Sequence, residues 1–344
     1  MNEQAATAVV GSAGRRKRQG GRSERGEQPM VPPAEFTSYY GRPVVKPAPW
    51  EHDVPAYLFL GGLAAGSSLL SAGADLTGRP ALRRTGRLGA LVGITLSMIA
   101  LVRDLGRPKR FHHMLRVAKP TSPMSVGTWI LTLYGPFAGL AAAGELRAFL
   151  PPRLRNGLLG RALGAAARPA GLTAAVVAPV VASYTAVLLS NTSTPTWHAA
   201  HRHLPFVFVS SASAASGGLG MLASPVSEAG PARRFAVGGA VLELAVERRM
   251  EAAMGITAEP LHDGHAGTLM KASKALTTAG TLGAVLLASR SRVGTMASGA
   301  ALLAGSACLR FGIFEAGQAS ARDPKYTVVP QRERIQHEGP TRSA

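Results

Sequence analysis

The stretch L-V-R-D-L-G-R-P-K-R-F-H-H-M-L-R-V-A-K-P-T-S-P-M-S-V-G-T-W, residues 101–129, decides the fold. An apolar run leads into it and another follows it, while the stretch itself carries six Lys or Arg residues, one acid, two histidines and three prolines. So many charges cannot lie in hydrocarbon, so the stretch is predicted to connect two membrane helices outside the bilayer. Pro108 is typical of a helix end, and Ser122 or Ser125 of a helix start.

The composition is that of a membrane protein. Of the 344 residues, 46% are hydrophobic and only 17% are charged, against about 25% charged in an average soluble protein. The 40 glycines suit closely packed membrane helices. A net charge of +19 is compatible with nucleic-acid binding in a soluble protein. Here the basic residues cluster between apolar runs, which favours the membrane surface and argues against a nucleic-acid partner.

Eight apolar runs follow the N-terminal segment, and most of them approach the roughly 20 residues that cross hydrocarbon. They cover about residues 54–74, 87–103, 126–146, 171–190, 204–223, 235–254, 270–289 and 295–317. The second run is short, and the sixth carries Glu243, Glu247 and Arg248. The sequence therefore predicts an all-α, polytopic membrane protein with eight transmembrane helices.

An internal repeat predicts how these helices are grouped. V-P-A-Y-L-F-L-G-G-L-A-A-G-S-S at 54–68 aligns with L-P-F-V-F-V-S-S-A-S-A-A-S-G-G at 204–218, an offset of 150 residues. Four spans separate the copies, so the copies run parallel, and two parallel four-helix bundles are expected. The predicted segments are a basic disordered tail at 1–49, a first bundle at 50–200, a second bundle at 201–320 and a polar C-terminal tail at 321–344. The bias of Lys and Arg places both termini in the cytoplasm and the protein in the cell membrane.

A metal cofactor held by this chain is not expected. One cysteine, Cys308, cannot bind an iron–sulfur cluster. None of the nine histidines lies in the middle of a predicted span, so haem is not expected either. His262 and His265 are too few ligands for a metal site.

Polar and aromatic residues gather at the helix ends on the predicted cytoplasmic side, and the opposite side shows nothing comparable. The gathered residues are Trp50, Glu51, His52, Asp53, Asp104, Ser125, Trp129, Asn191, Trp197, His198, His201 and His203. An aromatic belt with solvated histidines is the simpler interpretation. Asp53 and Asp104 favour a functional site, because acids at membrane depth are costly.

Four sequence blocks resemble the NrfD-like family, the membrane subunits of polysulfide reductase and nitrite-reduction systems. The blocks are D-L-G-R-P-x-R-F at 104–111, S-P-M-S-x-G-x-W at 122–129, W-x6-Y-L-F-L-G-G-L-A-A-G at 50–66 and Y-T-A-V-L-L-S-N-T-x-x-P-x-W at 184–197. The resemblance extends over residues 39–330. It implies a complex with a four-cluster iron–sulfur subunit and a molybdenum or tungsten catalytic subunit of the formate, polysulfide or nitrite type. Formate is the favoured donor, and the chain is a subunit rather than a stand-alone enzyme.

The resemblance also implies a menaquinone headgroup near the start of the first span. A quinone ring needs an apolar slot, and its oxygens need donors that exchange protons. The predicted quinone contacts are His52, Tyr57, Gly62, Trp129 and Tyr184, with Asp53 and Asp104 in proton exchange. Family members are described as using His, Asn and Tyr. No Asn stands beside His52, where Glu51 or Asp53 is found instead, so the donor set stays open. For the two tyrosines, helix packing or interfacial anchoring is the simpler alternative.

Charged residues within the later runs suggest a second feature. Glu243 and Glu247 lie one turn apart on the sixth run, and Arg310 and Glu315 lie on the eighth. Glu243 and Arg310 are candidates for a proton path, and a structural Arg–Glu pair is the simpler alternative.

The basic loop between the second and third spans is predicted to dock the acidic surface of the iron–sulfur partner. Its docking residues are Arg107, Lys109 and Arg110. Two other functions stay open, an ion- or proton-translocating subunit without a quinone and a non-redox membrane anchor. Bound quinone distinguishes the redox function from both.

Overall fold

The computed structural model describes residues 43–105, 108–287 and 291–338, and these form helices joined by short loops, without strands. The eight long helices are α1 (Asp53–Leu76), α2 (Pro80–Asp104), α3 (Pro123–Leu146), α5 (Leu158–Ser190), α7 (Leu204–Ala223), α8 (Gly230–Met254), α9 (Gly264–Leu286) and α10 (Arg292–Arg322). Shorter pieces are η1 (Pro108–Leu115), η2 (Arg147–Phe149), α4 (Pro152–Asn156), α6 (Pro195–Ala199), η3 (Gly255–Leu261) and α11 (Lys325–Glu338). The all-α prediction is thus confirmed for the described residues.

Six of the long helices are long and apolar enough to cross a membrane: α1, α2, α3, α5, α7 and α10. The chain is therefore a polytopic membrane protein. The remaining two of the eight predicted spans, α8 and α9, have the length but not the apolarity. Helix α8 carries Arg233, Arg234, Glu243, Glu247, Arg248, Arg249 and Glu251 along its 25 residues.

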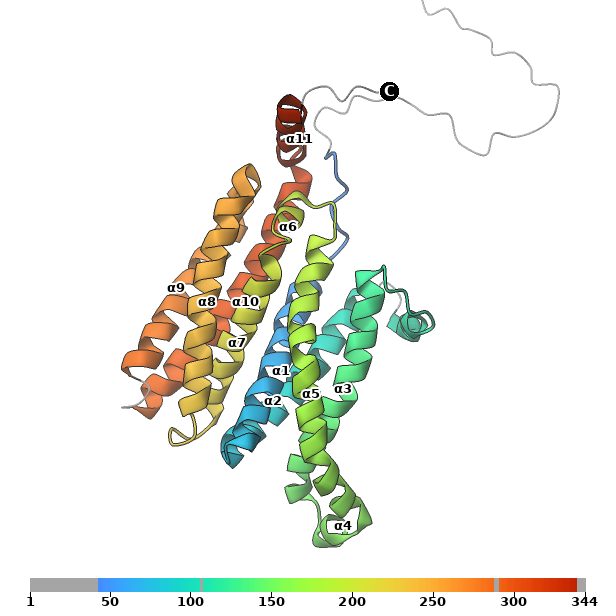
Figure 1. Cartoon of the computed structure of the whole chain (residues 1–344), viewed down its shortest axis with the longest axis vertical. Helices are drawn as coiled ribbons and strands as arrows, with labels where there is room; N and C mark the ends of the chain where they lie inside the picture. The colour runs from blue at the N-terminus through green and yellow to red at the C-terminus, as the bar shows by residue number, and fades with distance from the viewer. Residues whose placement is uncertain (1–42, 106–107, 288–290, 339–344) are drawn as a thin grey trace, which may run out of the picture. The chain divides into compact units, whose positions relative to one another are not determined.

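The helices pack most closely as antiparallel neighbours, α1 with α2, α7 with α8 and α9 with α10. Glycines allow this approach. A Cβ on Gly93 of α2 would lie 3.1 Å from the carbonyl oxygen of Leu60, and one on Gly280 of α9 would lie 3.0 Å from that of Ser298. Helices α1, α2, α3 and α5 lie together, and α7, α8, α9 and α10 lie beside them, with α1 against α7 (Figure 1).

A buried ion cluster lies where α1 and α3 end and α2 and α5 begin. The Nε of Arg83 lies 2.7 Å from Oε1 of Glu145, and Nη1 of Arg87 lies 3.0 Å from the same oxygen. Asp75 contacts Arg87 at 3.4 Å and Arg168 at 3.5 Å. The expectation that this side has no polar cluster is wrong. These residues come from four helices, so the sequence does not reveal that they meet.

At the other end, the segment before α1 is held against α10 and α6. The amide nitrogen of Gln318 donates to the carbonyl oxygens of Ala48 at 3.0 Å and Trp50 at 3.3 Å. The Trp50 ring stacks on Trp197, with their centroids 5.7 Å apart. Trp197 is fully buried and donates from Nε1 to the Ile313 carbonyl at 2.8 Å. Trp197 therefore belongs to the protein core and not to an aromatic belt.

Candidate functional site

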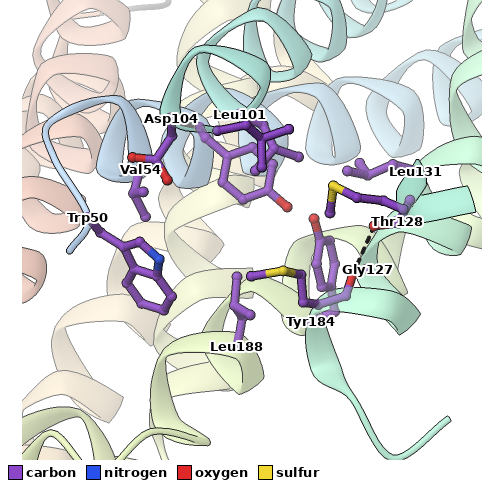
Figure 2. Close-up of a pocket in the computed structure, with 13 residues that line it drawn as sticks. Trp50, Val54, Leu101, Asp104, Gly127, Thr128, Leu131, Tyr184 and Leu188 are labelled. Carbon is purple, nitrogen blue, oxygen red and sulfur yellow. Dashed lines mark hydrogen bonds between the residues drawn. The ribbon is translucent and has the colours of Figure 1, made fainter. Parts of the chain in front are cut away.

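A mostly apolar pocket lies among the ends of α1, α2, α3 and α5, beside η1. Figure 2 shows Trp50, Asp104 and Tyr184 around this space. The lining residues are Trp50, Val54, Tyr57, Leu101, Asp104, Leu105, Met114, Met124, Gly127, Thr128, Leu131, Tyr184 and Leu188. The basic connection, residues 105–122, joins α2 to α3 and flanks the pocket. Asp104 at the end of α2 and Met124 at the start of α3 both line the pocket.

Tyr184 of α5 presents an unpartnered hydroxyl group. Its side chain is buried, and its hydroxyl oxygen has no hydrogen-bond partner among the residues that the structure describes. The ring packs against Gly127 of α3, where an added Cβ would lie 3.1 Å from the Cδ2 of Tyr184 and 3.2 Å from its Cζ. A glycine is therefore required at position 127 for this ring position. A buried polar group without a partner is costly, which favours a ligand oxygen as the missing partner.

Tyr57 and Asp104 add two more polar groups to the same walls. The Tyr57 side chain is only 2% exposed, and among the described residues no side chain or backbone group bonds its hydroxyl. Its helix is held in place by Ser97, whose hydroxyl donates to the Tyr57 carbonyl at 3.1 Å. From the described part of the chain, Asp104 accepts only a long contact, from the Glu51 backbone nitrogen at 3.5 Å. Two phenols and a carboxylate thus face one apolar space, and each has polar capacity to spare.

The pocket is narrow as it stands. Its cavity volume is about 50 Å³, and one water occupies roughly 10–15 Å³ by this kind of measure. A ring must therefore push the walls apart. Met114 and Met124 are suited to such movement, because an unbranched thioether chain adapts to irregular shapes. The site suits a flat apolar ring that carries oxygen acceptors.

Three of the predicted site residues, Tyr57, Asp104 and Tyr184, line this pocket. Four others do not. The His52 side chain is 81% exposed and lies 3.5 Å from Glu315, and Asp53 lies 3.6 Å from Nε of Arg103.

Gly62 and Trp129 point in other directions. A Cβ on Gly62 would meet Ala212 at 3.4 Å and Arg310 at 3.5 Å, so this glycine serves the contact between α1, α7 and α10. Trp129 lines a separate surface groove and is 42% exposed.

Sequence reasoning missed the pocket residues Met114, Met124, Gly127 and Leu188. Gly127 and Met124 both belong to the S-P-M-S-x-G-x-W block, which was a usable signal. Nothing in the sequence distinguishes Leu188 from the other leucines of α5.

A second polar group lies between α7, α8, α9 and α10. Glu243 and Glu247 of α8 are 0% and 1% exposed. One oxygen of Glu243 accepts from Thr277 at 3.1 Å, whereas within the described ranges its other oxygen and both oxygens of Glu247 have no hydrogen-bond partner. Lys274 lies 3.5 Å from Glu247 and 2.8 Å from Glu251, towards the surface.

Arg310 of α10 is buried near these acids but does not form an ion pair with Glu243. Its Nη2 donates to the Phe208 carbonyl at 2.7 Å, and its guanidinium lies 3.7 Å from the centre of the Phe208 ring. Its Nε and Nη1 have no hydrogen-bond partner in the part of the chain that the structure describes. The alternative of a direct structural Arg–Glu pair is therefore wrong, although Arg310 lies against α7 as a structural residue would.

Of the three predicted docking residues, Lys109 is exposed on η1. Arg107 and the side chain of Arg110 lie outside the described residues. Among the residues that the structure describes, no group of three or more His, Cys, Asp or Glu side chains is arranged to hold a metal ion.

Comparison with known proteins agrees with this geometry. The family model described as polysulphide reductase, NrfD, matches residues 44–229. The match includes α1 to α7 and every residue of the pocket. A search of curated proteins finds no match. Because the family model covers more than half of the chain, the protein belongs to the NrfD family, the membrane subunits of polysulfide-reductase-type oxidoreductase complexes.

Proposed function

We propose that the pocket binds the ring of menaquinone and that the protein exchanges electrons between an iron–sulfur partner and this quinone. The observation that carries the proposal is the unpartnered, buried Tyr184 hydroxyl in an apolar slot that Tyr57 and Asp104 also line. A quinone carbonyl oxygen is an acceptor that supplies the missing partner of a phenol. A slot lined by Leu101, Leu188 and Trp50 suits the faces of the ring.

The reaction would be the two-electron, two-proton interconversion of quinone and quinol. Reduction of the ring takes two electrons from the partner and two protons from the water side. Oxidation of the quinol returns the two electrons to the partner and releases the two protons to water. Tyr57 and Tyr184 would donate hydrogen bonds to the two ring oxygens. Asp104 is partly exposed at the end of α2, so it would pass protons between the ring and water.

The membrane arrangement that suits this function has eight spans in two parallel four-helix bundles. Helices α8 and α9 run beside α7 and α10, and one side of each faces those neighbours (Figure 1). Protein neighbours would therefore shield much of their charge from lipid. An even number of spans puts residues 43–52 and α11 on one side, and the Lys and Arg bias makes that side the cytoplasm.

The partners would dock beside the pocket. We infer a four-cluster iron–sulfur subunit held by the basic connection, in which Lys109 is exposed and Arg107 and Arg110 add charge. A molybdenum or tungsten subunit, with formate as its favoured substrate, would complete the complex. This chain would then be a redox subunit and not an enzyme by itself.

The experiment is purification in mild detergent with all co-purifying subunits, followed by extraction of quinone and assay of iron. We expect about one menaquinone per chain and iron in a second polypeptide. Asp104→Asn should slow quinol turnover, whereas Asp263→Asn, an exposed carboxylate at the start of α9, should not. A complex that binds no quinone, and whose turnover is the same in both variants as in the unmodified protein, would contradict the proposal.

A second candidate function is proton translocation, favoured by the two buried carboxylates of Glu243 and Glu247, one turn apart on α8, and by the ion pair that links Glu247 to the partly exposed Lys274. Chains of ionisable residues within membrane helices are typical of proton relays. The test is proton uptake by vesicles that contain the complex. Proton uptake in the absence of quinone turnover would support translocation, provided that Glu243→Gln abolishes this uptake and Tyr184→Phe does not. If a partner subunit contains iron but the complex binds no quinone and moves no protons, the chain would be a non-redox membrane anchor.

A further inference from the structure

A second cavity continues the pocket along the same two helices. It is a groove between α2 and α3 with a volume of about 560 Å³, roughly eleven times that of the pocket. Its α2 wall carries Leu91, Ile94, Met98 and Val102, and its α3 wall carries Leu131 and Gly135. The groove is mostly apolar, and its polar lining residues are Thr95, Arg103 and Thr132.

The groove and the pocket meet at Leu131. This side chain is 5% exposed and lines both cavities, and Figure 2 labels it on the pocket side. On both helices, residues of the pocket lie one turn from residues of the groove. Leu101 of the pocket is three residues from Met98 of the groove, and Thr128 of the pocket is four residues from Thr132 of the groove. Residues at these spacings lie on one helix face, so the two cavities occupy successive turns of α2 and α3.

The groove opens to the outer surface of the helix bundle. Ile99 is 50% exposed and Phe111 is 46% exposed on its rim. On α2 the lining residues extend from Leu91 to Arg103, which is about 18 Å at 1.5 Å per residue. The space beside Gly135 on the α3 wall is open, because a Cβ placed there would meet no other atom within 4 Å. An elongated, branched hydrocarbon therefore has room to lie in the groove while it is joined to a ring in the pocket.

We propose that the groove between α2 and α3 holds the isoprenoid tail of the quinone and is the lateral route by which the ring enters the pocket past Leu131. This inference rests on the proposed quinone site. A single ligand would then fill both cavities, with its polar ring at the helix ends and its hydrocarbon tail along the lipid-facing groove. Because the tail leaves lipid and not water, its contribution to affinity would come from van der Waals packing against the walls of the groove.

The test compares a long-tailed menaquinone with menadione, the same ring without a tail. The key variant is Gly135→Phe in the purified complex, because a phenyl group at position 135 would occupy the groove without touching the pocket. Gly139→Phe is the matched control, one turn further along α3, where a Cβ also meets nothing within 4 Å but the residue does not line the groove. The readouts are the Kd of each quinone and the KM for its turnover.

We expect Gly135→Phe to raise the Kd and KM of the long-tailed quinone about tenfold or more, with the values for menadione within twofold of the unmodified protein. Gly139→Phe should change neither. Unchanged binding of both quinones to Gly135→Phe would overturn the tail site and leave the proposed quinone function standing. If Gly135→Phe weakens both quinones equally, Thr95→Phe on the opposite wall decides, and an equal loss there also overturns the inference. An unmodified protein that binds neither quinone would instead refute the proposed function itself.

Discussion

Gly66 of α1 and Ser216 of α7 occupy equivalent positions of the internal repeat, 150 residues apart, and they face each other where α1 and α7 cross. A Cβ on Gly66 would lie 2.9 Å from the Cβ of Ser216 and 2.6 Å from the carbonyl oxygen of Ala212. Equivalent residues come together in this way only near the axis that relates two copies. The contact therefore supports the interpretation of the sequence similarity as a structural repeat.

The contact predicts a cost for any side chain at position 66. Gly66→Ala should lower the free energy of unfolding by about 1–3 kcal/mol, because the carbonyl of Ala212 cannot move without shifting α7. Gly73→Ala, on the same helix with nothing within 4 Å, is the control and should leave stability equal or slightly higher. The measurement is the Tm in detergent. Equal Tm values for both variants would show that α1 and α7 are less tightly packed.

Two buried tyrosines should separate binding from stability. Tyr184→Phe removes a hydroxyl without a protein partner, so stability should not fall while the Kd for menaquinone rises. Tyr134→Phe removes a hydroxyl that lies 2.7 Å from the Ser68 hydroxyl and donates to the Ala64 carbonyl at 2.8 Å. That change should cost about 1 kcal/mol of stability and leave the Kd unchanged. The opposite pattern would place the quinone elsewhere.

The ion cluster predicts strong dependence on Glu145. Glu145 and Arg87 are both nearly buried, so Glu145→Gln leaves Arg87 with much of its charge uncompensated. The expected loss is about 3–5 kcal/mol of unfolding free energy, as is usual when one partner of a buried pair is removed. Glu259→Gln is the control, because its pair with Lys325 is solvent-exposed and should contribute little. Chemical denaturation of the two variants measures the difference, and a loss as small as that of the control would mean that water reaches Arg87.

Substitution of His52 tests whether the quinone ring lies in the pocket or next to His52, which the sequence suggested as a hydrogen-bond donor. Its side chain is exposed beside Glu315 and does not line the pocket. His52→Ala should therefore change the Kd and turnover of menaquinone less than twofold, whereas Tyr57→Phe and Asp104→Asn should each reduce binding or turnover by about tenfold or more. Loss of quinone binding in His52→Ala alone would move the ring towards the surface, next to Glu315.

Local patterns were sufficient to predict the helices. Apolar runs bounded by Pro108 and Pro123 predict where a chain leaves and re-enters hydrocarbon, because transfer of charge into lipid is costly wherever the segment lies in the fold. The same logic placed Tyr57, Asp104 and Tyr184 near one membrane surface. The second helix begins at Pro80, earlier than the apolar run at 87–103, because charges on its first turns are paired by Asp75 and Glu145.

Tertiary packing decided which side chains meet. Trp129 lies two residues after Gly127, about 200° further around α3, so one faces the pocket and the other turns away. His52 precedes α1 and reaches α10 instead of the pocket. The direction of a side chain depends on which face its helix turns to its neighbours. Those neighbours are distant in sequence: Tyr184 of α5 is 57 residues from Gly127, and Glu315 of α10 is 263 residues from His52. Residue type and depth in the membrane follow from local sequence, whereas rotation about the helix axis follows from the packing of distant helices.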